Sequence, residues 1–451
     1  MKKIQTYENK KVLVLGLARS GEGAASLLNN LGAMVTVNDV LPMEENSDAQ
    51  KLLTRGIRVI AGSHPIELME EEFEFVVKNP GIPYNNPMLV RAQEKKIPII
   101  TEIELAYEVS EAPIIGITGT NGKTTTTTMV AKLLNANRKK GLALLSGNIG
   151  LPASSVVIEA TSDDDLVMEL SSFQLMGVNN FRPEIAVITN LYSAHLDYHG
   201  IREEYVSAKW KIQKKMEANN FLVINADQSE LVELAKNSEA TVIPFSTKRK
   251  VDGAYCLDNE LFYKDECIMS VLELGIPGEH NVENALAAIV VAKLRNVNHK
   301  DIREILKQFH GVPHRMQFVA EVNGRKFYND SKATNTLATK KALSGFCNAE
   351  TILLAGGLDR GEDFTELIPC FSKLKALIVF GETAEKLKKI GIQAGIERIE
   401  VVENVEFAVS LAYDLSEFQD TILLSPANAS WDQYKNFEVR GEKFMEAVRK
   451  L

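Results

Sequence analysis

The chain has 451 residues, of which 45% are hydrophobic and 25% charged, and its 51 basic and 60 acidic residues give a net charge of −9. These values are ordinary for a globular protein of two to four domains, and no apolar run approaches the roughly 20 residues that cross a bilayer. The negative charge, without any lysine or arginine cluster, argues against nucleic acid as a partner. The segment MKKIQTYENKK lacks the apolar core of a secretion signal, so we expect a cytoplasmic protein with no membrane insertion.

The first part of the chain has the pattern of a β-α-β unit over residues 11–39. Gly16 and Gly21 occupy the outer positions of G-x-G-x-x-G, but Ala18 replaces the middle glycine. That glycine normally lets the backbone approach a pyrophosphate, so its loss weighs against NAD. Another nucleotide ligand and a purely structural unit both stay open. Alternating strand and helix signals continue, which predicts a doubly wound, Rossmann-like domain over residues 1–101.

The most informative stretch is PIIGITGTNGKTTTTT, residues 113–128, where an apolar strand leads into a glycine-rich turn. Gly119 and Gly122 let backbone N–H groups close on an anion, and Lys123 adds a positive charge beside a helix N-terminus. Thr124 would offer its hydroxyl to a magnesium ion. The spacing departs from G-x-x-x-x-G-K-[ST], but a simple strand-to-helix turn would leave the lysine and threonine unexplained. The stretch therefore predicts a phosphate-binding loop.

Short apolar strands alternate with helical patterns through residues 102–311, which predicts a central parallel α/β domain of the P-loop type. Glu169 ends one strand, His195 follows another, and Lys209 lies on the next helix. Each has an ordinary alternative: a strand-end cap, a loop histidine and a solvated lysine. Because ligands bind at the carboxyl edge of such sheets, and all three follow a phosphate loop, we expect them at one active site.

The last part of the chain begins with a proline-bounded linker and a hairpin whose Asn323-Gly324 turn indicates type I′. Strand and helix signals then alternate to the C-terminus, which predicts a third, Rossmann-like α/β domain over residues 312–451. Just before this domain, Asn281 and Asn284 lie one turn apart at the start of a helix. They would either bond the backbone or present amides to a purine.

Seven motifs stand in order along the chain: TGTNGKTT, MELSSFQ, NLYSAHLDYHG, GEHNVENA, GVPHRMQ, NDSKATN and SPANASWDQYKNFEVRG. This series resembles the Mur ligases of peptidoglycan synthesis over all three domains. The resemblance implies an ATP-dependent ligase that phosphorylates a carboxylate to an acyl phosphate, which an amine attacks through a tetrahedral intermediate, releasing ADP and phosphate. NDSKATN and DQYKNFEVRG resemble the branch that adds D-glutamate to UDP-N-acetylmuramoyl-L-alanine, and we expect a monomer.

The resemblance also implies roles for individual residues. The ATP-binding residues would be Gly119, Thr120, Asn121, Gly122, Lys123, Thr124, Thr125, Asn281, Asn284, Arg315 and Asp330. Two Mg²⁺ ions would be held by Thr124, Glu169, His195 and Lys209. Lys209 would be carbamylated, because a carbamate is an anion that suits a hard cation whereas an ammonium repels it. The catalytic residues would be Lys123, Glu169, His195, Lys209 and Arg315.

Two further groups of residues would bind the substrates. The UDP substrate would contact Gly16, Leu17, Asp39, Asn148 and His195. D-glutamate would contact Lys332, Thr334, Arg360, Ser430 and Phe437. At Arg360 some relatives have lysine, and a guanidinium differs by binding a carboxylate as a fork.

Three alternatives stay open from the sequence. A sibling Mur ligase or a folylpolyglutamate-synthase-like ligase would share the loop but use another acceptor or amino acid. The first domain would also suit a nicotinamide-dependent oxidoreductase, although Ala18 and the phosphate loop disfavour it. In a non-catalytic nucleotide-binding module, Glu169, His195 and Lys209 would have no chemical role.

Overall fold

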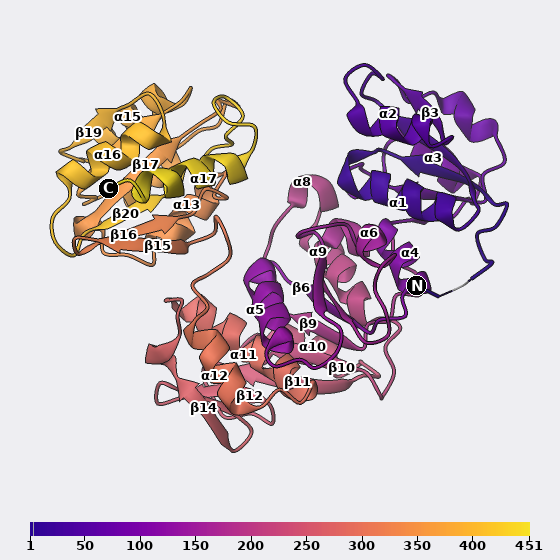
Figure 1. Cartoon of the computed structure of the whole chain (residues 1–451), viewed down its shortest axis with the longest axis horizontal. Coiled ribbons are helices and arrows are strands. Elements are labelled where there is room, and N and C mark those ends of the chain that lie inside the picture. Colours follow the sequence, from indigo (N-terminus) through magenta and orange to yellow (C-terminus); the bar gives the residue numbers. More distant parts are fainter. Residues whose placement is uncertain (3) are drawn as a thin grey trace. The chain divides into compact units, whose positions relative to one another are not determined.

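The computed structural model describes residues 1–2 and 4–451 and contains three sheets with helices on their faces (Figure 1). The described residues divide into two compact units. The first comprises residues 1–274 and 279–308, and the second comprises residues 275–278 and 309–451. The α/β class and the three-domain Rossmann-like and P-loop-type architecture are confirmed, while the exact boundaries 1–101, 102–311 and 312–451 stay a prediction.

The N-terminal sheet is wholly parallel, with strand order β3-β2-β1-β4-β5. Its strands are β1 (Lys11–Leu15), β2 (Met34–Asp39), β3 (Arg58–Ala61), β4 (Phe75–Lys78) and β5 (Ile99–Ile100). Its helices are α1 (Ala18–Asn30), α2 (Ser47–Thr54), η1 (Ile66–Glu70) and α3 (Pro87–Glu94). The strand order reverses between β1 and β4, which is where doubly wound sheets bind ligands.

The central sheet has the order β14-β13-β12-β11-β10-β9-β6-β8-β7. It is parallel from β7 to β12, and β13 and β14 add an antiparallel edge that the sequence pattern did not predict. The strands are β6 (Ile114–Thr118), β7 (Ala143–Gly147), β8 (Asp165–Glu169), β9 (Ile185–Ile188), β10 (Phe221–Asn225), β11 (Thr241–Ser246), β12 (Ala254–Leu257), β13 (Glu260–Tyr263) and β14 (Glu266–Ser270). The helices are α4 (Glu102–Val109), α5 (Lys123–Asn135), α6 (Ala153–Val156), α7 (Ser172–Leu175), α8 (Leu196–His199), α9 (Arg202–Trp210), η2 (Lys211–Gln213), α10 (Ser229–Ala235), η3 (Val271–Glu273), α11 (Glu279–Leu294) and α12 (His299–Lys307).

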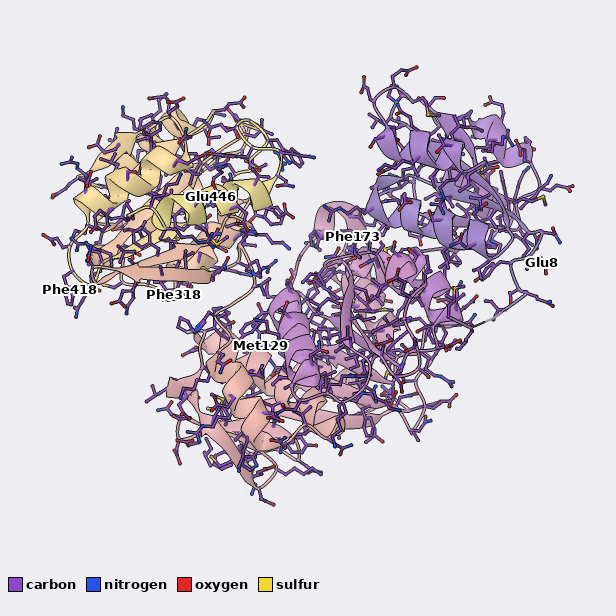
Figure 2. The ribbon with its side chains drawn as sticks, in the orientation of Figure 1. Glu8, Met129, Phe173, Phe318, Phe418 and Glu446 are labelled. Carbon is purple, nitrogen blue, oxygen red and sulfur yellow. The ribbon has the colours of Figure 1, made fainter. Side chains whose placement is uncertain are left out.

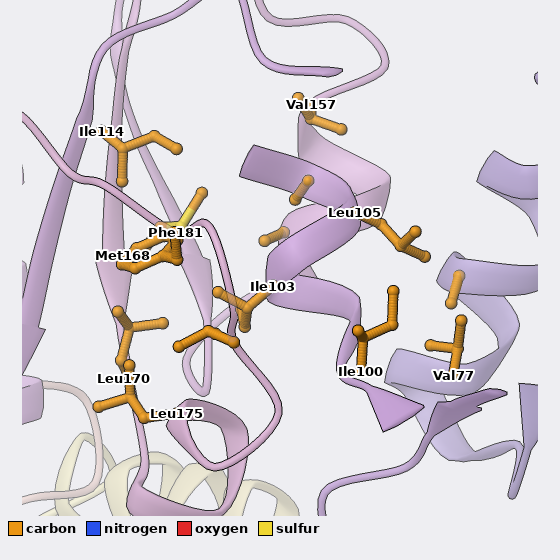
Figure 3. Packing of buried hydrophobic residues seen from close by; sticks show 14 of the residues in the cluster. Val77, Ile100, Ile103, Leu105, Ile114, Val157, Met168, Leu170, Leu175 and Phe181 are labelled. Carbon is orange, nitrogen blue, oxygen red and sulfur yellow. The ribbon is translucent and has the colours of Figure 1, made fainter. Parts of the chain in front are cut away.

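One hydrophobic core joins these two sheets. Val77 of the first sheet, Ile103 and Leu105 of α4, and Met168 of the second sheet belong to the same buried cluster (Figure 3). Burying an aliphatic side chain of this size stabilises a protein by about 1.5–3 kcal/mol. The shared core explains why both sheets fall within one compact unit.

The second unit has a mostly parallel sheet with the order β15-β16-β20-β17-β18-β19. The strands are β15 (Gln317–Val322), β16 (Arg325–Asn329), β17 (Thr351–Gly356), β18 (Ala376–Phe380), β19 (Ile399–Val401) and β20 (Thr421–Leu424). The helices are α13 (Thr336–Leu343), η4 (Asn348–Glu350), η5 (Thr365–Leu367), α14 (Ile368–Phe371), α15 (Ala384–Gln393), α16 (Val405–Leu415) and α17 (Phe437–Val448). β15 and β16 form the expected hairpin, and the turn residues Asn323 and Gly324 both have positive φ, as type I′ requires.

The helices carry no sign of a membrane span. Across residues 1–2 and 4–451, none has both the length and the apolar character needed to cross a bilayer.

Candidate active site

The predicted phosphate loop lies between β6 and α5. Gly119 has φ +145° and Gly122, the residue before the helix, has φ +80°. A Cβ at Gly119 would lie 2.0 Å from Thr189 Oγ1, and one at Gly122 would lie 2.2 Å from Asn284 Oδ1. Both positions therefore require glycine. The loop leads into the first turn of α5, and the N-terminus of a helix favours a bound anion.

Asn190 fixes the loop from the neighbouring strand end. Its carbonyl accepts from the Thr120 N–H at 2.8 Å, and its side-chain Oδ1 accepts from the Asn121 N–H at 2.8 Å. Lys123 folds back and donates to the carbonyls of Gly119 and Thr120, each at 3.0 Å. The hydrogen bonds of the Thr120 and Asn121 N–H groups thus fix the shape of the loop. The positive charge of Lys123 lies directly on the turn.

Lys209 lies on α9 and is only 2% exposed. The alternative of a solvated helix lysine is wrong. Its Nζ lies 3.5 Å from Thr118 Oγ1 and 4.8 Å from the centre of the Tyr205 ring. Burial lowers the pKa of this amine well below its usual value, and the charge of Lys123 lowers it further, while Glu169 opposes the shift. The surroundings of Lys209 at the end of β6 therefore disfavour the charged ammonium form of this amine.

Glu169 ends β8, the strand beside β6, and is also buried. Its Oε1 accepts a hydrogen bond from Asn148 Nδ2 at 2.8 Å. Its Oε2 is buried without a hydrogen-bond partner among the described residues. A buried carboxylate oxygen without a partner is costly unless a cation meets it, so Glu169 is arranged to receive one.

His195 precedes α8 in a left-handed conformation, with φ +56°, and is exposed. Its ring packs edge-on against Phe173 at 5.1 Å, and Figure 2 marks Phe173 beside α8. Behind it, His199 is buried with its Nε2 2.9 Å from Ser172 Oγ. Tyr205, which sequence reasoning missed, donates from its hydroxyl to Thr120 Oγ1 at 3.0 Å. The spacing of four between Tyr205 and Lys209 is the signal that could have identified this tyrosine.

Asn281 and Asn284 at the start of α11 are both buried. Asn284 Oδ1 accepts from Thr126 Oγ1 at 3.2 Å, and Asn284 Nδ2 donates to Asn281 Oδ1 at 3.2 Å. Asn284 therefore contacts the phosphate-loop helix, and the bond between these two amides places the pair beside the predicted nucleotide site.

The turn after β1 is held by Asp39. Its Oδ2 accepts from the Leu17 N–H at 2.7 Å, and its Oδ1 accepts from the Leu41 N–H at 2.9 Å. Gly16 has φ +81°, and a Cβ there would lie 2.6 Å from the Ile82 side chain. The three residues predicted to contact the UDP substrate, Gly16, Leu17 and Asp39, thus form one connected turn.

In the second unit, Arg315 precedes β15, and the other predicted residues follow the ends of β16, β17 and β20. Asp330 is buried, with Oδ1 accepting from the Met316 N–H at 3.1 Å and Oδ2 from Ser425 Oγ at 3.0 Å. Burial raises the pKa of Asp330 to about 7, although the nearby charge of Arg315 opposes this shift. His314 is buried with φ +60° and its Nδ1 lies 3.1 Å from Asn329 Nδ2.

The residues predicted to bind D-glutamate lie on loops that follow the strands of this sheet, except Phe437, which is the first residue of α17. Lys332 Nζ lies 5.4 Å from the centre of the Phe437 ring, and Arg360 lies 4.8 Å from the centre of the exposed Trp431 ring. Ser430 Oγ is buried without a hydrogen-bond partner among the described residues. Thr334 is half-buried two residues beyond Lys332.

Arg440, which sequence reasoning missed, connects these loops. It is fully buried and donates to the carbonyls of Ser331, Gly356 and Asn428 and to the Ser331 hydroxyl at 2.9–3.2 Å. It lies in the first turn of α17, far in the sequence from Ser331 and Gly356. No local pattern reveals such a role.

A phosphate loop beside a buried carboxylate and a buried amine, on a parallel sheet, defines a nucleotide-dependent enzyme. Three family models match the chain: "Mur ligase MurD-like, N-terminal domain" over residues 10–101, "Mur ligase middle domain" over 117–292 and "Mur ligase, glutamate ligase domain" over 314–428. The chain belongs to the Mur ligase family.

The chain is also similar to a ligase by sequence and to two solved ligases by structure. The UDP-N-acetylmuramoylalanine–D-glutamate ligase of Enterococcus faecalis is 64% identical over 100% of this chain and 99% of its own. The crystal structure of the UDP-N-acetylmuramate–alanine ligase MurC of Thermotoga maritima matches with a TM-score of 0.59 and 21% identity, covering 98% of this chain and 99% of its own. MurF of the same organism, solved with ADP, has a TM-score of 0.56 at 16% identity over 99% and 96% of the two chains.

Proposed function

We propose that this chain is an ATP-dependent ligase that joins the amine of D-glutamate to the carboxylate of UDP-N-acetylmuramoyl-L-alanine, a step of peptidoglycan synthesis. The observation that carries the proposal is full-length 64% identity to a ligase named for this reaction. The phosphate loop with buried Glu169 and Lys209 supplies matching chemistry. Sibling ligases with other substrates are disfavoured, since those found among solved structures are far less similar.

The reaction needs ATP because a carboxylate does not react with an amine at neutral pH. An oxygen of the acceptor carboxylate attacks the γ-phosphorus of ATP, the bond to the β-phosphate oxygen breaks, and ADP leaves. The unprotonated amine of D-glutamate then attacks the carbonyl carbon of the acyl phosphate to give the tetrahedral intermediate. The nitrogen loses a proton to solvent, the bond from carbon to the phosphate oxygen breaks, and phosphate leaves. Lys123 and the first turn of α5 hold the phosphates in line, and Arg315 neutralises charge that develops on the γ-phosphoryl group.

The residues at the loop fit two Mg²⁺ ions. The described residues include no cluster of three or more His, Cys, Asp or Glu side chains suited to a metal. Mg²⁺ in phosphoryl-transfer sites, however, is held by one or two carboxylates together with substrate phosphates and water. The buried Glu169 Oε2 without a partner suits this role, as does the Thr124 hydroxyl, with His195 as a neighbour of the acceptor. Bound Mg²⁺ would supply charge neutralisation between ATP and the acceptor.

Lys209 fits this site as a carbamate. The neutral amine attacks the carbon of CO₂, an N–C bond forms as one C=O π pair moves onto oxygen, and the amine loses a proton to solvent to give the carbamate anion. Its lowered pKa supports this step, because only an unprotonated amine is nucleophilic. The resulting anion would complete the magnesium site beside Glu169.

In the third domain, we assign D-glutamate to Lys332, Thr334, Arg360, Ser430 and Phe437. The buried Ser430 hydroxyl, which has no hydrogen-bond partner among the described residues, would donate a hydrogen bond to a carboxylate of this amino acid. Lys332 and Arg360 would supply positive charge for its two carboxylates. We assign adenine to Asn281 and Asn284, and the nucleotide to Thr125 and Asp330 as well. The UDP substrate contacts Gly16, Leu17, Asp39 and Asn148. The protein acts as a monomer in the cytoplasm.

The assay is phosphate release from ATP with UDP-N-acetylmuramoyl-L-alanine. Release should require D-glutamate, and L-glutamate, L-alanine and a diamino acid should not replace it. Faster release with another amino acid than with D-glutamate would contradict the assignment.

A further inference from the structure

Lys78 ends β4 at the carboxyl edge of the N-terminal sheet. It lies opposite Leu15 of β1 in the strand register, and the strand order reverses between these two strands. Doubly wound sheets bind their ligands in the crevice at this reversal. Lys78 therefore stands where this domain is expected to receive its substrate.

The ammonium group of Lys78 is surrounded by neutral groups. The residue is 1% exposed, and its Nζ lies 3.3 Å from the Pro80 carbonyl, 3.4 Å from Tyr198 OH and 4.7 Å from the centre of the Tyr84 ring. No carboxylate of residues 1–2 or 4–451 makes an ion pair with it. Two long hydrogen bonds do not compensate a buried cation, so the site lacks an anion.

We propose that Lys78 binds an anionic group of the acceptor substrate, either its diphosphate or its terminal carboxylate. This inference rests on the proposed function. The segment after Lys78 packs on the turn that we assign to the nucleotide: Asn79 Nδ2 donates to the Leu17 carbonyl at 3.2 Å and to Ser20 Oγ at 3.1 Å. Burial lowers the pKa of Lys78 to about 8, and an anionic ligand would restore its full charge.

Tyr198 offers the competing explanation, in which Lys78 only ties two sheets together. Its hydroxyl accepts from Lys78 and donates to the Ile82 carbonyl at 3.1 Å, and its ring packs 4.6 Å from that of Phe173. Tyr198 lies three residues after His195. Removing the Tyr198 hydroxyl would break this tie while leaving the Lys78 cation in place.

The experiment compares binding and stability in Lys78→Met, Tyr198→Phe and the control Lys95→Met. Lys95 lies in the same domain but pairs with Glu70 at 2.8 Å. For Lys78→Met, we expect the Kd for UDP-N-acetylmuramoyl-L-alanine, measured by calorimetry without ATP, to rise at least 30-fold. Tyr198→Phe and Lys95→Met should change it less than threefold.

Binding of UDP identifies the group. An equal loss of UDP affinity in Lys78→Met assigns the diphosphate, because UDP has no carboxylate, whereas unchanged UDP affinity assigns the carboxylate. The Tm of Lys78→Met should hold or rise, since methionine keeps the apolar stem and removes an uncompensated charge. A marked fall in its Tm, an unchanged acceptor Kd, or the same loss in Tyr198→Phe would overturn the proposal. These measurements need no turnover, so they fail independently of the ligase assay.

Discussion

Replacing Lys209 by alanine or by methionine separates its chemical role from its packing. In the unliganded protein its Nζ makes one long hydrogen bond, of 3.5 Å, to Thr118 Oγ1. Methionine keeps the volume of the stem, so it should change the free energy of unfolding by less than about 1.5 kcal/mol. Loss of one preorganised charge beside the reacting phosphoryl group should cost about 3–4 kcal/mol in the transition state, which is a 10²–10³-fold fall in kcat.

The two variants then differ in rescue. Lys209→Ala leaves room for formate or acetate to supply the missing carboxylate, so phosphate release should recover at least tenfold with millimolar additive. Lys209→Met fills that space and should not recover. Native mass spectrometry of the unsubstituted protein should show bound CO₂ that Lys209→Met lacks. Absence of rescue in the alanine variant together with absence of a CO₂ adduct would refute the carbamate.

Three further substitutions test other parts of the structure. Glu169→Gln should lower turnover about 100-fold. It should not lower the free energy of unfolding in urea, because Glu169 Oε2 has no hydrogen-bond partner among the described residues. A loss of more than about 1 kcal/mol in that free energy would indicate a structural role. Gly122→Ala should lower the free energy of unfolding in urea by about 2–4 kcal/mol, since its Cβ would lie 2.2 Å from Asn284 Oδ1. The control Gly56→Ala has φ +81° but no atom within 4 Å of its Cβ, so it should lower this free energy by only about 1 kcal/mol. The raised pKa of Asp330, about 7 against 3.8, contributes stability below pH 3.8 that is lost as pH rises through 7. Asp330→Asn should therefore gain up to about 4 kcal/mol over the unsubstituted protein between pH 4 and pH 8, and a pH-independent difference would contradict this.

The parts of the site that could be predicted from the sequence share one property: they lie in a short run of residues. The phosphate loop is encoded by Gly119 and Gly122 with the adjoining Lys123 and Thr124, and Glu169 is the last residue of an apolar strand. The antiparallel strands β13 and β14 were missed although their pairing is local, because the two-residue turns Asp258-Asn259 and Lys264-Asp265 lack the glycine that usually signals a hairpin. Arg440 and Lys78 were missed because their partners are distant in the sequence or lie in turns without a pattern.

The hydrogen bonds of three buried basic side chains, Arg440, Lys78 and Lys209, distinguish a structural role from roles directed at a ligand. Arg440 makes four bonds of 2.9–3.2 Å to oxygens of the protein, so its charge is satisfied before any substrate binds. Lys78 makes two bonds, and Lys209 one, all at 3.3–3.5 Å. Folding therefore compensates Arg440 internally. The cost of burying Lys78 as a cation is offset only when a ligand supplies an anion, whereas Lys209 avoids that cost by losing its proton. It follows that Arg440→Lys should destabilise the protein, because lysine cannot reach all four oxygens, while methionine at the two lysines should leave stability intact and remove function.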